Sequence, residues 1–308
     1  MVEFLLHLLL KTVFAGVTSR PDLLRPPAII LPAEASAAPE GELFVAPEPP
    51  RKIDSASLGV KLTAPTAALI DMRSGEVLFS QGDDRVVPIA SITKLMTAIV
   101  LLELKPDWNK RIAIEPGDNA LEGIPYLKTG DTLSAEDLFD VMLVGSANNA
   151  AMALSRSSGI SREEFVARMN AKARVLGLVH TNFADPTGYK PENRSSALDV
   201  ARLAATALGH QEIREALTEK EVVVKTALGH ERRVPATDEL LHSFLNQGEF
   251  QIVGGKTGYT EEAGYTLVLR AKKGEADVIS IVLGSRTSDD RFQDAKSLLF
   301  WGFKTFEW

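Results

Sequence analysis

The sequence predicts an α/β protein in which a strand-rich lobe is interrupted by a mainly helical lobe. Turn-separated β-rich segments lie near both ends of the folded part, and helix-like segments fill most of residues 107–217 between them. With 308 residues, 45% of them hydrophobic and 24% charged, the chain is long enough to bury a substantial core. We therefore expect a folded domain over 57–308, with a helical lobe at about 91–217 inserted in an α/β lobe.

The N-terminal part precedes this domain and has a different composition. Residues 4–17 form an apolar stretch broken by His7 and Lys11, which predicts an export signal or membrane anchor within 1–17. Glu3 stands where a signal peptide carries positive charge, so a frayed helix or a misplaced start remains an alternative. Eight of the sixteen prolines fall in 18–52, and we expect a disordered linker over 18–56.

Within the folded part, the spacing of apolar residues and the turn or capping residues at segment ends predict the following elements. Residues 65–79 predict two strands joined by a Met-Arg-Ser-Gly turn, and 88–105 predict a helix bounded by two prolines. Further helices are expected at 134–158, 161–177 and 195–209, where Ser134 and Ser161 begin capping-box patterns. Strands follow at 220–228, 250–258, 264–273 and 276–285, and a closing amphipathic helix at 289–306.

Composition excludes several classes of function. The net charge of −7 and the lack of long basic runs argue against nucleic acid as a partner. The chain has no cysteine, which excludes disulfides, thiolate catalysis and thiolate metal sites. A Ser-His-Asp triad stays open as an alternative, although no serine lies in a G-x-S-x-G nucleophile elbow. No metal-ligand spacing is found among the five histidines, which are His7, His180, His210, His230 and His242.

The first candidate site lies in the predicted helix PIASITKLMTAIVLLELK at 88–105. Ser91 and Lys94 are one turn apart on one face of a helix that is apolar nearly all round. Burial and the positive helix end would both disfavour a charge on Lys94, and a neutral amine can take a proton from a neighbouring hydroxyl. From this stretch alone, the alternative is that Ser91 caps the helix while Lys94 extends to solvent.

Two further motifs could complete a site. Ser146 and Asn148 stand among small residues in VGSANNAAM, an arrangement that places a hydroxyl and an amide on one side of a turn. Lys256, Thr257 and Gly258 follow the β-rich FQIVG, where a strand edge can bind an extended peptide and its carboxylate. A second Lys-Thr-Gly at 128–130 precedes a helix cap, so we interpret it as a turn without a role in the site.

The ordered motifs S-x-x-K, S-x-N and K-T-G resemble those of the penicillin-binding proteins and serine β-lactamases. DPTGY at 185–189 and GGKTGYTEEAGYTLV at 254–268 look more narrowly like the low-molecular-mass D-alanyl-D-alanine carboxypeptidases and endopeptidases, and the likeness covers about 64–306. It implies their fold, an antiparallel sheet lobe flanked by helices with an inserted helical lobe. Ala147 departs from the Gly or Asp that the family often has there, and the chain looks like a shorter member.

The resemblance implies a role for each matching residue. Ser91 would attack the carbonyl between two D-alanines, Lys94 would accept its proton, and Ser146 would relay that proton to the leaving amine. Asn148 would hold the lysine and the substrate amide. Lys256 and Thr257 would bind the terminal carboxylate. The backbone amides of Ser91 and of Tyr259, just past Gly258, would form the oxyanion hole.

The implied partners are peptidoglycan stem peptides ending in D-Ala-D-Ala and β-lactams as covalent inhibitors, with no metal or organic cofactor and no nucleic acid. Such an enzyme would work outside the cytoplasmic membrane, in the periplasm or at the cell wall, with a possible tether through the N-terminus. A DD-endopeptidase and a β-lactamase remain alternatives, although the Glu-x-x-Leu-Asn string of class A β-lactamases is missing. A non-catalytic wall-binding module is a further alternative. The presence of all four polar motif residues argues against it, and they are Ser91, Lys94, Ser146 and Lys256.

Overall fold

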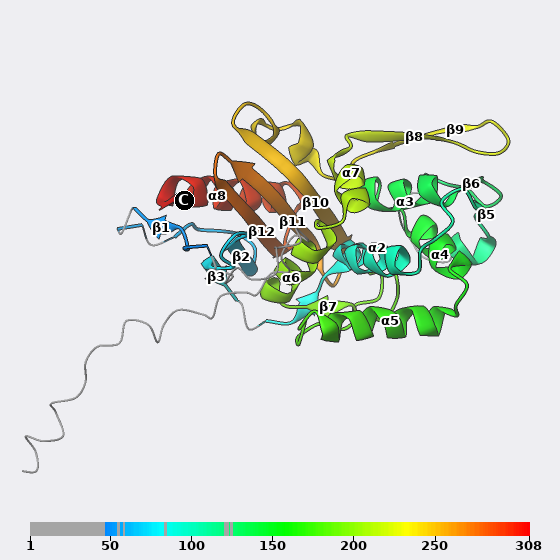
Figure 1. The fold of residues 1–308 in the computed structure, drawn as a ribbon, viewed down its shortest axis with the longest axis horizontal. Helices are drawn as coiled ribbons and strands as arrows, with labels where there is room; N and C mark the ends of the chain where they lie inside the picture. Colours follow the sequence, from blue (N-terminus) through cyan, green and yellow to red (C-terminus); the bar gives the residue numbers. More distant parts are fainter. Residues whose placement is uncertain (1–46, 54–55, 58, 83–84, 120–122, 124–125) are drawn as a thin grey trace, which may run out of the picture.

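The computed structural model describes residues 47–308 apart from 54–55, 58, 83–84, 120–122 and 124–125 (Figure 1). The predicted export signal or anchor and most of the predicted linker lie outside the described residues. Among the helices of the described part, none combines the length and the apolar character that a membrane span requires.

A five-stranded antiparallel sheet organises the molecule, with the strand order β10-β11-β12-β2-β3. Two of its strands, β2 and β3, come from the start of the folded sequence, and the other three come from its end. The strands are β2 (Thr66–Asp71), β3 (Val77–Gln81), β10 (Phe250–Thr260), β11 (Gly264–Lys273) and β12 (Ala276–Ser285). The predicted hairpin at 65–79 and the predicted strand at 250–258 are confirmed, and β10 is an edge strand.

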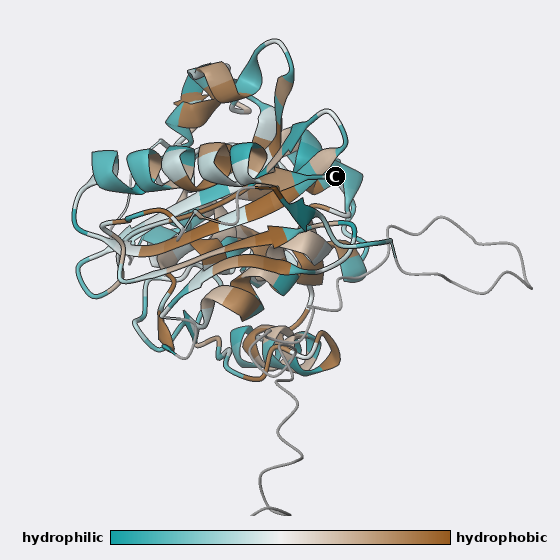
Figure 2. Cartoon of the chain, turned by 90° about the vertical axis from the view of Figure 1, so that its left-hand side faces the viewer, coloured by the Kyte–Doolittle hydropathy of each residue, from teal (hydrophilic) through white to brown (hydrophobic). Residues whose placement is uncertain are grey.

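Helices cover both faces of this sheet because its central strands are apolar on both sides. Every residue of β2 is buried, and β12 is buried over most of its length. Helix α8 (Ser288–Thr305) packs on one face, and α6 (Ala197–Ala207) packs on the other. Figure 2 shows hydrophobic residues concentrated on the strands, while the surface turns are hydrophilic.

The chain between the two halves of the sheet is mainly helical, as predicted. Serine side chains cap the starts of several of these helices, and the full capping box predicted at Ser134 is present. The predicted helix at 134–158 is divided by a turn at Gly145–Ala147. Besides α6, the helices are α2 (Lys94–Glu103), α3 (Ala135–Val144), α4 (Asn148–Ser157), α5 (Arg162–Val175) and α7 (Gln211–Thr218).

Short two-stranded ladders and 3₁₀ turns complete the described part. The ladders pair β1 (Arg51–Lys52) with β13 (Phe306–Glu307), β4 (Val87–Pro88) with β7 (Arg194–Ser195), β5 (Arg111–Ala113) with β6 (Thr132–Ser134), and β8 (Glu221–Lys225) with β9 (Glu231–Pro235). The 3₁₀ turns are η2 (Ala90–Thr93), η3 (Pro116–Asn119), η4 (Glu239–His242) and η5 (Phe244–Asn246). The β1–β13 pairing brings the two ends of the described chain side by side.

The prediction of one continuous helix over 88–105 is wrong at its start. Residues Ala90–Thr93 form the 3₁₀ turn η2, and the α-helix begins only at Lys94. Ala90 has a φ of +48°, which no α-helix accommodates, so the chain turns sharply immediately before Ser91. The Ser91 side chain therefore does not cap α2, because that helix starts three residues later without a side-chain cap.

Candidate active site

Ser91 and Lys94 meet at the junction between η2 and α2. Side chains at i and i+3 eclipse one another in a 3₁₀ turn, and the Lys94 Nζ donates to Ser91 Oγ at 2.8 Å. Two glycines let other segments approach this turn. A Cβ on Gly258 would lie 2.8 Å from the Ser91 amide nitrogen, and one on Gly188 would lie 1.9 Å from the Ala90 carbonyl oxygen. Side chains at either glycine would displace the turn.

Lys94 is the first residue of α2, and its side chain is fully buried. Besides Ser91, its amine donates to Asn148 Oδ1 at 2.7 Å and to the Thr187 carbonyl oxygen at 2.8 Å. Burial lowers the pKa of Lys94 to about 7, although the Asp185 carboxylate opposes this shift. A large fraction of the amine is therefore neutral at pH 7 and able to accept a proton from the adjacent hydroxyl.

Asp185 organises the loop that supplies the Thr187 carbonyl. Burial raises the pKa of Asp185, but hydrogen bonds from its own loop outweigh burial and hold the pKa below its ordinary value. The five bonds come from the Thr187 amide and hydroxyl, the Gly188 and Lys190 amides and the Asn193 side chain. Sequence reasoning assigned Asp185 no role, although a carboxylate before a Thr-Gly turn is a recognisable turn signal.

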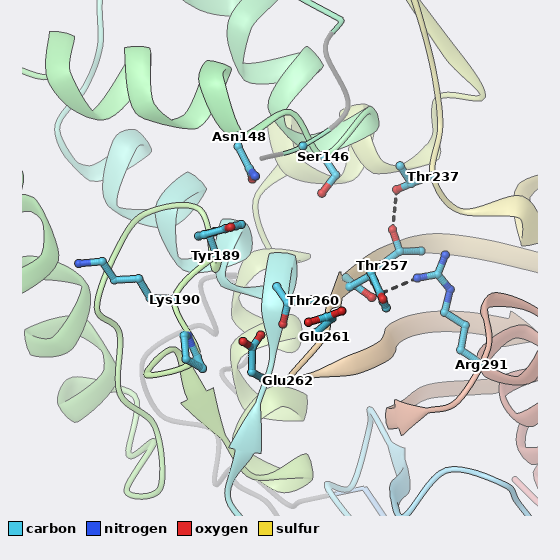
Figure 3. Close-up of a pocket in the computed structure, with 14 residues that line it drawn as sticks. Ser146, Asn148, Tyr189, Lys190, Thr237, Thr257, Thr260, Glu261, Glu262 and Arg291 are labelled. Atoms are coloured by element: carbon cyan, nitrogen blue, oxygen red, sulfur yellow. Dashed lines mark hydrogen bonds between the residues drawn. The ribbon is translucent and has the colours of Figure 1, made fainter. Parts of the chain in front are cut away.

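Ser146 and Asn148 lie where α3 gives way to α4. Ser146 has a left-handed φ of +59°, and Asn148 is the first residue of α4. Such strain in a non-glycine residue is typical of functional sites. Both side chains line one cleft (Figure 3), and the Asn148 side chain also accepts a hydrogen bond from the buried Lys94 amine. The structure thus brings the first and second predicted motifs together.

The third motif lies on the edge strand β10, as predicted, but its lysine is placed differently from the expectation. Lys256 is only 1% exposed, its Nζ donates to the Thr257 carbonyl oxygen at 3.1 Å, and it does not line the cleft. Burial, with added repulsion from Lys94 and Arg291, holds the pKa of Lys256 well below its ordinary value. Lys256 is therefore buried beside the cleft and is not part of its lining, and its lowered pKa disfavours a charge there.

The cleft that joins these motifs has a volume of about 670 Å³. Ser91 and Lys94 are not among its lining residues, but Asn148 and Gly258, which contact them, are. Tyr259 is half-exposed at its edge and stacks on Tyr265. The lining consists of Gly123, Ser146, Asn148, Tyr189, Lys190, Pro191, Thr237, Thr257, Gly258, Tyr259, Thr260, Glu261, Glu262 and Arg291.

Two residues beside Thr257 escaped sequence reasoning. The Thr257 hydroxyl donates to the Thr237 hydroxyl at 2.6 Å, and Arg291 Nη1 donates to the Gly258 carbonyl oxygen at 3.1 Å (Figure 3). Arg291 is 8% exposed, and its Nε has no hydrogen-bond partner within the described part of the chain. A buried guanidinium beside two hydroxyls can bind a carboxylate. Neither residue belongs to a local motif, so no sequence signal pointed to them.

The other Lys-Thr-Gly, at 128–130, lies in an exposed turn before β6. Its Thr129 hydroxyl accepts a hydrogen bond from Asn119, and the Gly130 amide donates to the Ile114 carbonyl oxygen. It is absent from the cleft lining. This agrees with its interpretation as a structural turn.

The assembled groups suit acyl transfer. A hydroxyl is held 2.8 Å from an amine whose pKa is near 7, next to a cleft that is lined by a second hydroxyl, an amide and a buried guanidinium. Among the residues that the structure describes, no group of three or more His, Cys, Asp or Glu side chains could hold a metal ion.

Comparison with known proteins connects this site to one family. Residues 52–287 match the peptidase family S11, described as D-alanyl-D-alanine carboxypeptidase. The chain is 33% identical over 259 residues to a D-alanyl-D-alanine endopeptidase of Pseudomonas aeruginosa, covering 83% of this chain and 82% of that one. It is 37% identical over 251 residues to the carboxypeptidase DacC of Escherichia coli, covering 78% of this chain and 61% of that one.

A solved structure is also similar to this chain. Penicillin-binding protein D2 of Listeria monocytogenes in its ampicillin-bound form has a TM-score of 0.69 and 33% identity, covering 80% of this chain and all of that one. The antiparallel sheet with its inserted helices is thus the fold of penicillin-binding proteins, as predicted.

Proposed function

Because the chain belongs to the D-alanyl-D-alanine carboxypeptidase family and is a serine-type peptidase, we propose that it removes the terminal D-alanine from peptidoglycan stem peptides. The observation that carries this proposal is the 2.8 Å contact between Ser91 Oγ and the buried Lys94 amine. The proposed catalytic domain spans 57–308. Release of free D-alanine from an N-acylated tripeptide ending in D-Ala-D-Ala tests the proposal, and no release at any pH would contradict it.

Acylation begins when neutral Lys94 takes the Ser91 proton and Ser91 Oγ attacks the carbonyl between the two D-alanines. The amides of Ser91 and Tyr259 would donate to the developing oxyanion. This assignment is supported by the close approach of Gly258 to the Ser91 amide. The C–N bond then breaks, and the Ser146 hydroxyl passes the proton from Lys94 to the departing amine. Water hydrolyses the ester and regenerates Ser91.

The carboxylate of the last D-alanine would bind at Thr257, with the Thr237 hydroxyl and the Arg291 guanidinium beside it. All three residues line the cleft, and the Arg291 guanidinium already donates to the carbonyl of Gly258, another lining residue. Lys256, when protonated, would add positive potential beside the cleft. The Asn148 side chain, already bonded to Lys94, would hold the amide of the preceding residue.

The two Lys-Thr-Gly copies allow a matched test of this assignment. Lys256→Met keeps most of the buried volume but removes the charge, and we expect kcat/KM to fall roughly 10- to 100-fold, as for loss of a charged interaction. Lys128→Met, at an exposed turn, should leave kcat/KM within about twofold of wild type. A larger loss from Lys128→Met than from Lys256→Met would show that the other copy serves the site.

We place the enzyme outside the cytoplasmic membrane, where peptidoglycan is exposed, with its N-terminus as an export signal or tether. β-Lactams would act as covalent inhibitors, because they present a strained amide and a carboxylate to the same groups. The ampicillin-bound relative supports this expectation.

A slow second step is expected with penicillins. The class A string Glu-x-x-Leu-Asn is missing, and the cleft-lining Glu261 and Glu262 follow the exposed end of β10, where they are open to solvent. We therefore expect benzylpenicillin to acylate Ser91 and remain bound for minutes or longer, with nitrocefin turnover below about one per minute. Intact-mass spectrometry would show the adduct, and rapid nitrocefin hydrolysis would favour a β-lactamase instead.

A DD-endopeptidase is the second candidate, because an endopeptidase from P. aeruginosa covers 83% of this chain. Both activities cleave after a D-alanine, and they differ in the size of the leaving group. Mass spectrometry of the products from purified cross-linked and uncross-linked muropeptides separates them. Release of D-alanine from uncross-linked pentapeptides alone supports the carboxypeptidase.

A further inference from the structure

A buried carboxylate that the mechanism does not use lies behind the cleft. Asp238 follows Thr237 directly and is only 4% exposed. Its Oδ1 accepts a hydrogen bond from the Leu240 amide at 3.0 Å, whereas its Oδ2 has no hydrogen-bond partner among the described residues. Leaving a buried carboxylate oxygen unpaired costs free energy. Capping of η4 through Oδ1 therefore does not account for the unpaired Oδ2 of Asp238.

The geometry of β10 brings this carboxylate against the third motif. A Cβ on Gly255 would lie 2.9 Å from Asp238 Oδ2, so the absence of a side chain at Gly255 leaves room for the carboxylate next to the strand. Gly255 immediately precedes Lys256, and the side chain of Thr257 bonds to the residue that precedes Asp238. Asp238 therefore lies directly behind the proposed carboxylate subsite.

The charges that face Asp238 come from three elements. They are Lys256 on β10, Arg291 on α8 and Glu239 on η4 itself. The charge of Lys94 lowers the pKa of Lys256, and Tyr265 raises the pKa of Arg291. Burial raises the pKa of Asp238 to about 6, while the Leu240 amide, Arg291 and Lys256 oppose the shift. Both protonation states are thus accessible near neutral pH.

We infer that Asp238 is a positioning residue that tunes the affinity of the cleft for the substrate's terminal carboxylate: its ionised form weakens this binding and its protonated form strengthens it. The inference rests on the proposed function, which brings a carboxylate to Thr257 and Arg291. A bound carboxylate supplies the counter-charge to Lys256 and Arg291. Ionised Asp238 is then a surplus negative charge in a site of low dielectric, where like charges repel strongly.

Because protonation of Asp238 and binding of the carboxylate are thermodynamically linked, the affinity of the cleft depends on pH. Below pH 6 Asp238 is already protonated in the free enzyme and does not oppose the ligand. Above pH 6 the ligand must either bind beside a like charge or bind together with a proton. Affinity therefore decreases as pH rises through about 6. If binding raises the pKa of Asp238 by one unit, the loss is about tenfold.

Calorimetric binding of the tripeptide to non-hydrolysing Ser91→Ala enzyme measures this effect. The double variant Ser91→Ala/Asp238→Asn keeps the shape but holds position 238 neutral. We expect the two proteins to bind equally at pH 5, and the Asp238→Asn protein to bind about tenfold more tightly at pH 8. Comparing the two proteins at the same pH cancels groups that do not interact with Asp238, so the difference reports Asp238 together with its effect on the pKa of Lys256.

Two controls separate this effect from a general change in charge. Glu239→Gln in the Ser91→Ala background removes the neighbouring carboxylate, which is exposed and screened, and should change affinity by less than about twofold. The same tripeptide with a C-terminal carboxamide should bind both position-238 proteins equally.

Three results would overturn the inference. They are weaker binding by the Asp238→Asn protein at pH 8, the same ratio of affinities at both pH values, and no binding of the carboxylate peptide at either pH. Absence of D-alanine release by the enzyme with Ser91 intact would contradict only the proposed function, since binding to Ser91→Ala is measured independently.

Discussion

Replacement of Ser91 by alanine is expected to abolish covalent labelling by a fluorescent penicillin and to lower D-alanine release by on the order of 10⁶-fold, the loss seen when a serine nucleophile is removed. The exchange deletes the only atom that would form the acyl-enzyme. The hydroxyl is half-buried and serves no cap, so the fold should tolerate its loss. Gel fluorescence and a D-alanine assay measure the two outcomes.

Ser146→Ala is the matched control for Ser91→Ala, because it removes a second hydroxyl from the same proposed active site. We expect this variant still to form the penicillin adduct, although more slowly, because a proton relay contributes less than the nucleophile. Equal melting temperatures for both variants would exclude unfolding as the cause. Adduct formation that survives Ser91→Ala would show that the nucleophile is another residue.

Replacement of Lys94 by methionine is expected to lower the rate of penicillin acylation roughly 10³-fold, within the range for general-base catalysis. In the wild type the neutral amine is the active species. Because burial lowers the pKa of Lys94 to about 7, the acylation rate should rise with pH through about 7 and then level off. Stopped-flow acylation between pH 5.5 and 9 measures this profile, and Lys94→Met should lack the rise near 7.

Lys94→Arg distinguishes the base from a simple positive charge. Arginine stays protonated at these pH values, so this variant should lose activity as Lys94→Met does, although it keeps a cation. Acylation by Lys94→Arg at a rate near wild type would contradict the role of a neutral amine. A wild-type profile without a rise near pH 7 would contradict it as well.

The buried Lys94 has a cost in stability. The amine must lose its proton, or be held charged in a dry site, whereas in the unfolded chain it keeps its ordinary pKa of 10.5. A depression to about 7 corresponds to about 4 kcal/mol of folding free energy at pH 7. Stability from this group is therefore lowest near and below pH 7 and increases as pH rises toward 10.5. Such a cost is typical of a residue retained for function.

Several features of the site could be predicted from sequence because they depend on neighbours along the chain. Local signals, namely the spacing of apolar residues and the turn and capping residues, were enough to predict the hairpin at 65–79, the strand at 250–258 and the Ser134 cap. The predicted start of α2 is wrong because Ala90 adopts a positive φ, at a point where Gly188 of the 185–189 loop packs against its carbonyl group. Alanine has no preference for turns, so the sequence around Ala90 does not predict its positive φ.

By itself, the sequence determined the α/β class, the edge position of the Lys256 strand and the order of the three motifs, since each of these is written in short-range patterns. The tertiary structure alone decided that Lys94 is fully buried with a pKa near 7, and that Lys256 is buried without lining the cleft. It also brought Asp185, Arg291 and Asp238 to the site. Burial and electric field depend on atoms from elements far apart in the chain, and no local pattern contains that information.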